Sequence, residues 1–417
     1  MATEIREFAH LEIPLEVIQK ATNNFSDENI IGKGGFGYVY KGQITHRGEL
    51  TNIVARRSNR RRGQADVEFW TEISVLSGNH HKYYNTVELI GYVDEKEEKI
   101  IINRDNFAKG SLVKYLSDPT FTCSQRLYVS IDLARAIGYI HHSLDQSYYI
   151  IHRNINSYTV LLDDDWGAWL SGFEYSLKHP KERRNQIFLC DEVIGTHGYM
   201  DPADLKNGGV NHKSDIYSFG VVLFELMCGR KAKDDQDNNK LLVSLAKFHY
   251  ENGTMHEIIH PDLLKQMSQR SLKCFSKAAY SCLQEDRARR PDVEKVLRKL
   301  QKALSLKSTY YSQMTYGKNE EYEEKVKDMN NGKDAEDEIE SDQNDEEDDN
   351  ETYGGGPYFL KSKSQKTNII SDCTPSRGSE GQLLSTLDDA LKHNLCYIVF
   401  GADRSLHRGR LCVNIAA

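Results

Sequence analysis

A glycine-rich run near the start of this 417-residue chain has a spacing that could do chemistry: Gly32-Lys33-Gly34-Gly35-Phe36-Gly37-Tyr38-Val39. Gly32, Gly34 and Gly37 form a G-x-G-x-x-G pattern, in which unhindered backbone can cover the phosphates of a nucleotide. The apolar residues around it predict a strand on each side rather than a strand followed by a helix. This placement disfavours a dinucleotide site of the Rossmann type.

Further pairs of residues follow this run in a fixed order, and their joint spacing is far more specific than the glycines alone. Together they predict one phosphate-handling domain rather than several unrelated motifs. The series is Val54-Ala55, Glu72 in a segment of helical spacing, His152-Arg153, Ser214-Asp215 at the start of an apolar helix, and Arg290-Pro291.

With this series the chain resembles the eukaryotic protein kinases, and most closely the plant receptor-like kinases. The juxtamembrane signature of those proteins is similar to Ala21-Thr22-Asn23-Asn24-Phe25-Ser26, and their central large-lobe helix is similar to Ser218-Phe219-Gly220-Val221-Val222-Leu223. The resemblance runs from about residue 11 to about residue 305. It implies a two-lobed fold that would bind ATP and transfer its γ-phosphate to protein.

The chain departs from that family at the positions that carry the chemistry. A kinase needs a strand Lys for the phosphates, a loop Asp as base, a loop Asn for one Mg²⁺ and a further Asp for the other. The resemblance places Arg57, Asn154, Thr159 and Gly172 at these four positions, and Asn156 where a phosphate-facing Lys is expected. Because an amide cannot act as a base, the loss at Asn154 alone should cost on the order of 10² to 10⁴ in rate.

The resemblance also implies which parts of the scaffold are kept. Arg57 is expected to pair with Glu72, and Asp215 and Arg290 are expected to have structural roles. The apolar spine that joins the two lobes matches Leu76, Leu89, His152 and Phe173, and the walls of an adenine pocket match Val39, Ala55 and Leu161.

Two further positions, which regulate or stabilise the domain in the family, also differ in this chain. Between Gly172 and Gly195 the only hydroxyl side chains are Tyr175 and Ser176, so a phosphorylated apex for Arg153 is not expected. Ala203 stands where the family has a Glu that pairs with the equivalent of Arg290. Arg290 must therefore find other acceptors or destabilise its lobe.

The order of the predicted elements indicates an α+β fold in two lobes. Strand patterns dominate up to Ile102, with one helix between them, and helical spacing dominates beyond Gly110. We expect a kinase-like domain over 11–305, with a small β-rich lobe over about 26–108 and a larger helical lobe over about 109–305.

Residues 306–417 differ in composition from the domain that precedes them. Residues 318–351 carry 17 acidic and 4 basic residues, a net charge of −13, so we expect 306–366 to be an acidic disordered linker. Residues 367–417 have too few apolar positions for an independent core, and their fold is left open.

Composition excludes several classes of protein. No run of 18 or more apolar residues could cross a bilayer, and the first ten residues lack the apolar core of a signal peptide. The eight cysteines include no C-x-x-C pair, and the histidines show no ligand spacing with them, so we expect no metal site. The positive charge is dispersed, which argues against nucleic acid as a partner.

These patterns lead to one favoured interpretation, a receptor-like cytoplasmic pseudokinase that signals by binding proteins, with receptor or cytoplasmic kinases as expected partners. It would bind ATP weakly and without Mg²⁺. Peripheral association with the inner face of the plasma membrane stays open. The alternatives are an active Ser/Thr kinase with unconventional chemistry, in which Glu174 or Asp163 would supply a metal ligand, and an acidic-tail interaction protein that uses the fold as a scaffold.

Overall fold

The computed structural model describes residues 5–34, 37–58, 65–77, 85–95, 97–142, 148–190, 193–233 and 241–306. All of them lie in the first of two compact units, which spans Met1–Lys333. The expected acidic linker, apart from its first residue, and the C-terminal segment lie outside the described residues.

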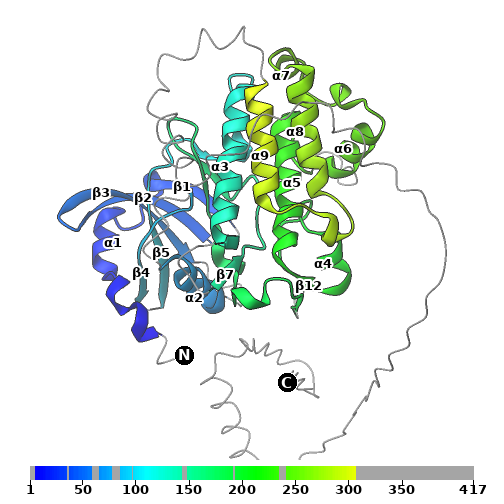
Figure 1. Cartoon of the computed structure of the whole chain (residues 1–417). Helices are drawn as coiled ribbons and strands as arrows, with labels where there is room; N and C mark the ends of the chain where they lie inside the picture. Colours follow the sequence, from blue (N-terminus) through cyan, green and yellow to red (C-terminus); the bar gives the residue numbers. More distant parts are fainter. Residues whose placement is uncertain are drawn as a thin grey trace, which may run out of the picture. The chain divides into compact units, whose positions relative to one another are not determined.

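An antiparallel sheet of five strands in the order β1-β2-β3-β5-β4 forms the first part of the fold (Figure 1). Helix α2 (Ala65–Leu76) packs on one face of the sheet, here called the α2 face, and α1 (Leu15–Ala21) on the other, the α1 face. The strands are β1 (Ile30–Gly34), β2 (Gly37–His46), β3 (Glu49–Ser58), β4 (Leu89–Glu95) and β5 (Glu98–Arg104).

Strand alternation decides which residues meet each helix, because successive side chains of a strand point to opposite faces. Ile53 and Ala55 of β3 are fully buried in a cluster with Leu15 and Ile18 of α1. Ile101 of β5 instead joins a cluster with α2. The even-numbered residues of β3 therefore lie on the α2 face, which is the face toward the rest of the domain.

Two glycines allow the N-terminal segment to pack closely on the sheet. A Cβ atom on Gly42 would lie 2.7 Å from the backbone oxygen of Ala21, and one on Gly91 would lie 2.4 Å from that of Leu11. Both distances are shorter than real carbon contacts allow. Hence α1 and the 3₁₀-helix η1 (Ile5–Leu11) can only pack at this depth against glycine.

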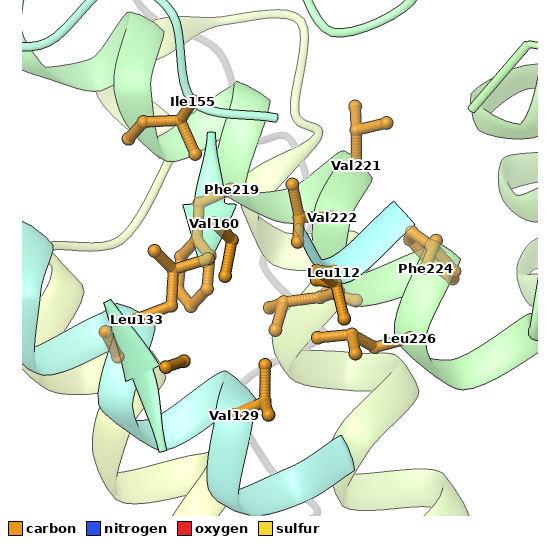
Figure 2. Close-up of a cluster of buried hydrophobic side chains, with 14 of the residues drawn as sticks. Leu112, Val129, Leu133, Ile155, Val160, Phe219, Val221, Val222, Phe224 and Leu226 are labelled. Atoms are coloured by element: carbon orange, nitrogen blue, oxygen red, sulfur yellow. The ribbon is translucent and has the colours of Figure 1, made fainter. Parts of the chain in front are cut away.

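The second part of the fold is helical. Helix α5 lies at its centre with all but one of its residues buried (Figure 1). Helices α3, α6 and α8 pack against it, and α9 packs on α3 and α8. Figure 2 shows Val129 and Leu133 of α3 and Phe219 of α5 gathered about Val160. The helices are α3 (Cys123–His142), α4 (Pro202–Asn207), α5 (His212–Cys228), α6 (Leu242–Glu251), α7 (Pro261–Lys265), α8 (Gln269–Cys282) and α9 (Val293–Ser305).

Local signals in the sequence explain the position of α5. Asn211 accepts a hydrogen bond from the Lys213 amide while Ser214 accepts one from the Asn211 amide, which is a capping box. Gly229, with a φ of 69°, ends the helix. A Cβ on Gly220 would lie 2.7 Å from Cβ of Cys282, so glycine is required where α5 crosses α8.

Three small sheets hold the loops between these helices. They have the orders β6-β8-β9, β10-β7 and β11-β12. Their strands are β6 (Gly110–Ser111), β7 (Tyr148–Ile151), β8 (Val160–Leu162), β9 (Ala168–Leu170), β10 (Leu177–Pro180), β11 (Phe188–Leu189) and β12 (Gly209–Val210).

The α+β class with a β-rich and a helical part is as the sequence predicted. Within the described ranges, no helix combines the length and the apolar character needed to span a bilayer.

Candidate functional site

Arg56, two residues after Val54 on β3, is the cation at the centre of the site. Its guanidinium forms an ion pair with Glu72 of α2, and its Nη1 lies 3.9 Å from Oε2 of Glu174. Glu174 belongs to the short helix η5 (Phe173–Tyr175), which packs against α2. Arg56 thus connects the sheet, α2 and the loop after β9.

The prediction that Arg57 pairs with Glu72 is wrong. Arg57 lies on the α1 face, where its Nε and Nη2 donate to the Glu98 carboxylate at 2.7 and 2.6 Å, and its guanidinium lies 4.4 Å from the centre of the Phe25 ring. The expected assignment of Val54-Ala55-Arg56-Arg57 is shifted by one residue relative to the structure. In a strand, such a shift moves every side chain to the opposite face of the sheet.

The same shift corrects one wall of the expected adenine pocket. Ala55 is fully buried on the α1 face, and Val54 takes its place on the α2 face. Val39 pairs with Arg56 across the β2–β3 ladder and therefore also lies on the α2 face. Leu161 of β8 is half-buried and packs against the core of the helical part.

Burial and charge act against each other at the Arg56–Glu72 pair. Burial raises the pKa of Glu72 to about 7, although Arg56 pulls it down. Burial lowers the pKa of Arg56, but Glu72 and Glu174 outweigh this and leave it raised. The guanidinium is therefore permanently charged and faces two carboxylates.

The loop from His152 to Asn156 is anchored by Asp215, the first-turn acid of α5. The Asp215 carboxylate accepts hydrogen bonds from the amides of His152 at 2.8 Å and Arg153 at 2.9 Å, and from Nε2 of His141 at 2.9 Å. Arg153 has a φ of 67°, and the two amide bonds hold it in this strained conformation.

Asn154, at the position expected for a catalytic base, is held by hydrogen bonds at both ends of its amide. Its Nδ2 donates to Glu174 Oε1 at 3.2 Å, and its Oδ1 accepts from Thr196 Oγ1 at 2.8 Å and from Asn156 Nδ2 at 3.0 Å. Both asparagines are buried. They join the loop to η5 and to the segment before α4, and neither offers a group that takes a proton.

The two positions expected to bind metal are in contact with each other. Gly172 has a φ of 86°, and a Cβ atom there would lie 2.6 Å from Cγ2 of Thr159. The hydroxyl of Thr159 donates to the Asn154 carbonyl at 2.9 Å. A methyl group therefore lies beside Gly172, where a second carboxylate or amide would be needed to hold a cation.

The residues that the structure describes contain no group of three or more His, Cys, Asp or Glu side chains arranged to hold a metal ion.

Comparison with known proteins identifies the fold. The family described as protein tyrosine and serine/threonine kinase matches residues 25–300. The chain belongs to the protein kinase family, in its plant receptor-like branch. Relatives from Arabidopsis thaliana include the receptor-like protein kinase ANXUR2, 37% identical over 301 residues, and the receptor-like protein kinase FERONIA, 34% identical over 297 residues.

These matches cover 71% and 70% of this chain but only 34% and 32% of the two relatives. A third relative from the same plant, the probable receptor-like protein kinase At2g23200, is 36% identical over 327 residues, which are 77% of this chain and 37% of the relative. The chain therefore spans about a third of the length of these proteins.

The four residues expected to form an apolar spine lie in or against one buried region of the molecule. Phe173 and His152 meet edge to face with ring centres 4.6 Å apart, and Leu76 belongs to the same buried cluster as Phe173. Leu89 packs against this cluster. Burial lowers the pKa of His152 to about 4, so it donates to the Ser171 carbonyl as a neutral ring.

Arg290 finds another acceptor in place of the side chain missing at Ala203. Its Nη1 and Nη2 donate to the two oxygens of Asp201 at 2.5 and 2.8 Å, and both side chains are fully buried. Arg287 donates to the same carboxylate at 2.8 Å. Asp201 also caps α4 by accepting from the Ala203 amide, so one carboxylate fixes a helix and a buried cation.

In the activation segment of this kinase fold, between Gly172 and Gly195, the described residues are held by a strand pair, a ring stack and hydrogen bonds. Strand β10 pairs with β7, and the His179 ring stacks on Phe188 with ring centres 3.6 Å apart. The Tyr149 hydroxyl and the His212 ring hydrogen-bond the carbonyls of Arg183 and Arg184. Arg153 donates to the Tyr175 carbonyl at 3.3 Å.

The glycine-rich loop joins β1 to β2. Gly34 of β1 pairs with Gly37 of β2, and Gly37 has a φ of 130°, which favours glycine. Gly32 lies within β1, and a Cβ there would contact Val39. Residues 35 and 36 lie outside the described residues.

Besides Arg56 and Val54, the sequence reasoning missed Asn103 of β5, which lies opposite Val54 in the strand ladder. It also missed the contact of Glu174 with Arg56. A signal for Asn103 was present, because it is the polar residue that ends the apolar run Ile100–Ile102. Glu174 gave no such signal, because only the folded loop brings it to Arg56.

Proposed function

We propose that this kinase-family chain is a pseudokinase, a scaffold or regulator that acts by binding proteins rather than by transferring phosphate. The observation that carries the proposal is the hydrogen bonding of Asn154. Both ends of its amide are used within the protein, and no carboxylate lies at its position to accept a proton from a substrate hydroxyl.

The metal positions support the same proposal. Phosphoryl transfer needs cations to neutralise the charge that develops on the phosphate oxygens. Gly172 brings no ligand, and Thr159 directs its hydroxyl to a backbone carbonyl. When nucleotide binds, we therefore expect weak binding that does not depend on Mg²⁺.

The partners implied by this function are other proteins, with receptor or cytoplasmic kinases as the expected class. A cytoplasmic location, with or without contact to the inner face of the plasma membrane, is part of the same proposal. The described part of the activation segment supports it, because strand β10 and the stack of His179 on Phe188 give this surface a defined shape that a partner can recognise.

A phosphate-transfer assay tests the proposal. The purified full chain is incubated with γ-labelled ATP, with Mg²⁺ or Mn²⁺, and with a generic protein substrate, alongside an active receptor-like kinase as positive control. We expect no label on the chain or the substrate above background. Label that is present on the wild type and absent from an Arg56→Ala variant would show that the chain itself is a kinase.

An active Ser/Thr kinase with unconventional chemistry is the second candidate, and one observation favours it. The Arg56–Glu72 pair and the spine of Leu76, Leu89, His152 and Phe173 are assembled as in an active-like kinase core. A thermal-shift titration separates the two candidates. ATP that raises the melting temperature sharply only when Mg²⁺ is added would favour the second.

A further inference from the structure

Helices α8 and α9 carry seven cationic side chains and only one carboxylate between them. The cations of α8 recur at positions i, i+3 and i+7, and three of the cations of α9 repeat the same spacing. Each set therefore lies along one side of its helix. The cations are Arg270, Lys273 and Lys277 on α8, and Lys295, Arg298, Lys299 and Lys302 on α9.

The cationic side of each helix faces away from the core. Six of the seven cations are exposed, and Lys299 is half-buried. On the opposite sides, Phe275 of α8 and Leu300 of α9 are fully buried. Both helices are thus amphipathic, with their charge on the solvent side.

The two helices lie side by side and run in opposite directions (Figure 1). The Ser268 hydroxyl donates to the Leu306 carbonyl at 2.6 Å. The Ser271 hydroxyl donates to the Ala303 carbonyl, also at 2.6 Å. The start of α8 therefore lies beside the end of α9.

Lys299 shows that the two sets of cations share one surface. Burial lowers the pKa of its ammonium group, and the charges of Lys277 on α8 and Lys295 on α9 lower it further. The seven cations therefore form one basic field about 20 Å long, the length of each helix, here called the α8–α9 face. In the sequence the same charges are dispersed from residue 270 to residue 302, and the fold gathers them.

The α8–α9 face has no counter-charge from the described part of the chain. None of its seven cations forms an ion pair with a carboxylate among the described residues. Glu294, the one acid on α9, pairs with His142 of α3 at 2.8 Å. Asp292, just before α9, pairs with Lys213 at 2.6 Å. The face is therefore free to bind an anionic partner.

The composition of the face favours a lipid surface over a protein. Protein interfaces are centred on apolar and aromatic side chains and are depleted in Lys. Here five of the seven cations are Lys, and every apolar side chain of the two helices is buried or half-buried. An anionic bilayer attracts clustered Lys and Arg side chains through its surface potential and needs no apolar anchor.

We propose that the α8–α9 face binds the surface of anionic phospholipid bilayers, with the two helices lying along the headgroups. The whole chain carries a net charge of −8, but the Debye length is only about 10 Å at 0.1 M salt, so the bilayer responds to the local positive charge. The inference goes beyond the proposed function and holds whether or not the chain transfers phosphate.

A vesicle sedimentation assay without nucleotide tests the proposal. The purified full chain is mixed with vesicles of phosphatidylcholine, either alone or with about 30% phosphatidylserine, in about 0.1 M salt. We expect binding to the anionic vesicles only, and a partition coefficient that falls at least about tenfold in 0.5 M salt. Equal binding to both kinds of vesicle, or no binding to the anionic kind, would overturn the proposal.

A quadruple variant assigns the binding to the face. Each Lys or Arg near an anionic surface contributes about fivefold in affinity, so the loss of four charges should weaken binding at least about hundredfold. A partition coefficient equal to that of the wild type would show that the face is not the site. The variant combines the exposed positions Lys273→Gln, Lys277→Gln, Arg298→Gln and Lys302→Gln.

A matched control removes the same charge from exposed positions outside the two helices. It should change the partition coefficient by less than about threefold, because those positions lie away from the face. A loss as large as that of the first variant would show that net charge governs binding and would overturn the proposal. The control combines Lys20→Gln, Lys41→Gln, Lys114→Gln and Lys206→Gln.

Circular dichroism melting shows whether each variant is folded. A third variant keeps every charge of the face and should keep the wild-type partition coefficient, since the attraction depends on charge and not on side-chain shape. A loss of binding in this folded variant would contradict the proposal. It combines Lys273→Arg, Lys277→Arg, Arg298→Lys and Lys302→Arg.

Competition separates a lipid surface from other polyanions. A peptide of about twenty Glu residues, or a DNA duplex of about twenty base pairs, is added to the bound chain at a charge equal to that of the anionic lipid. Either competitor should release less than about half of the chain from the vesicles. Release of more than half would assign the face to an acidic protein segment or to nucleic acid, and would overturn the proposal.

Discussion

Gly172 and Thr159 stand at the two positions where the family resemblance places metal ligands, and they pack against each other. Two small side chains replace two ligands, and the methyl group of Thr159 occupies the space next to the Gly172 Cα. The hydroxyl of Thr159 and that of Ser171, which donates to the Thr159 carbonyl at 2.8 Å, bind backbone only. Restoring one ligand therefore requires changing both residues.

Gly172→Asp alone should destabilise the fold by about 1–3 kcal/mol. The new Cβ would lie 2.6 Å from the Thr159 methyl group, and the residue would keep a φ of 86°. The measurement is the free energy of unfolding in urea.

The double variant Gly172→Asp, Thr159→Asn removes that methyl group and should recover part of the loss. It should also make ATP binding respond to Mg²⁺. If the single variant is as stable as the wild type, the packing argument is wrong.

At the scale of elements, strand β3 shows which structural features the sequence predicts and which it does not. A strand at Ile53–Ala55 was predicted from the residue pattern, and the link to Glu72 was implied by the family resemblance, whereas the neighbouring strands of β3 were not predicted. The register was not predicted either, because Val54-Ala55-Arg56-Arg57 offers two adjacent arginines and both readings leave an arginine near Glu72. The burial of Ile53 and Ala55 against α1 decides it, and that contact joins residues about 35 apart in sequence.

The loop contacts could not be predicted for the same reason. Glu174 meets Arg56, and Asn154 meets Thr196, only after the chain has folded back over more than 40 residues. By contrast, the capping of α5 and the roles of His152, Phe173 and Asp215 follow from motifs whose geometry is local or fixed by the family.

Substituting the two arginines separately tests the register. Arg56→Ala leaves Glu72, which is 2% exposed, without its cation and should cost about 3 kcal/mol. Arg57→Ala breaks the ion pair with Glu98, whose two side chains are 36% (Arg57) and 25% (Glu98) exposed, and should cost about 0.2–1 kcal/mol. Urea unfolding of both variants gives the two values, and equal losses would contradict the assigned register.

Asp201 tests the junction of α4 with the segment that carries Arg290. Asp201→Asn keeps a good helix cap but removes the charge opposite a fully buried guanidinium, so we expect a loss of about 3–5 kcal/mol. Lys265, whose pair with Asp262 is exposed, provides the control: Lys265→Ala should change stability by less than about 0.5 kcal/mol. If Asp201→Asn leaves the free energy of unfolding unchanged, the backbone acceptors of Arg290 are sufficient for its guanidinium.

For the whole molecule, burial of titratable groups sets the dependence of stability on pH. Burial lowers the pKa of His152 and His179 to about 4 and that of His212 to about 3. Below the ordinary pKa of 6.5, these histidines bind protons in the unfolded chain but not in the folded protein. Acid therefore favours unfolding, and the stability of the protein falls as the pH is lowered below 6.5.

The buried carboxyl groups act in the opposite direction. Burial raises the pKa of Glu225 to about 8 and that of Asp204 to about 7. In the folded state Glu225 keeps a proton that the unfolded chain releases above its ordinary value of 4.5. Its contribution to stability is complete below pH 4.5 and is lost as the pH rises toward 8.

One pH unit above the ordinary value of 6.5, the histidines of the unfolded chain are about nine-tenths deprotonated, so the carboxyl groups dominate from about pH 7.5 to pH 8. Stability should therefore fall as the pH rises through this window, by up to about 1.4 kcal/mol per pH unit for each proton released. Glu225→Gln removes one of these protons while its amide oxygen can still accept from Tyr199 and Ser157, so its unfolding free energy should vary less over the same window. The measurement is urea unfolding at quarter-unit steps of pH, and a wild-type stability that stays constant or rises over the window would show that Glu225 is ionised in the folded protein.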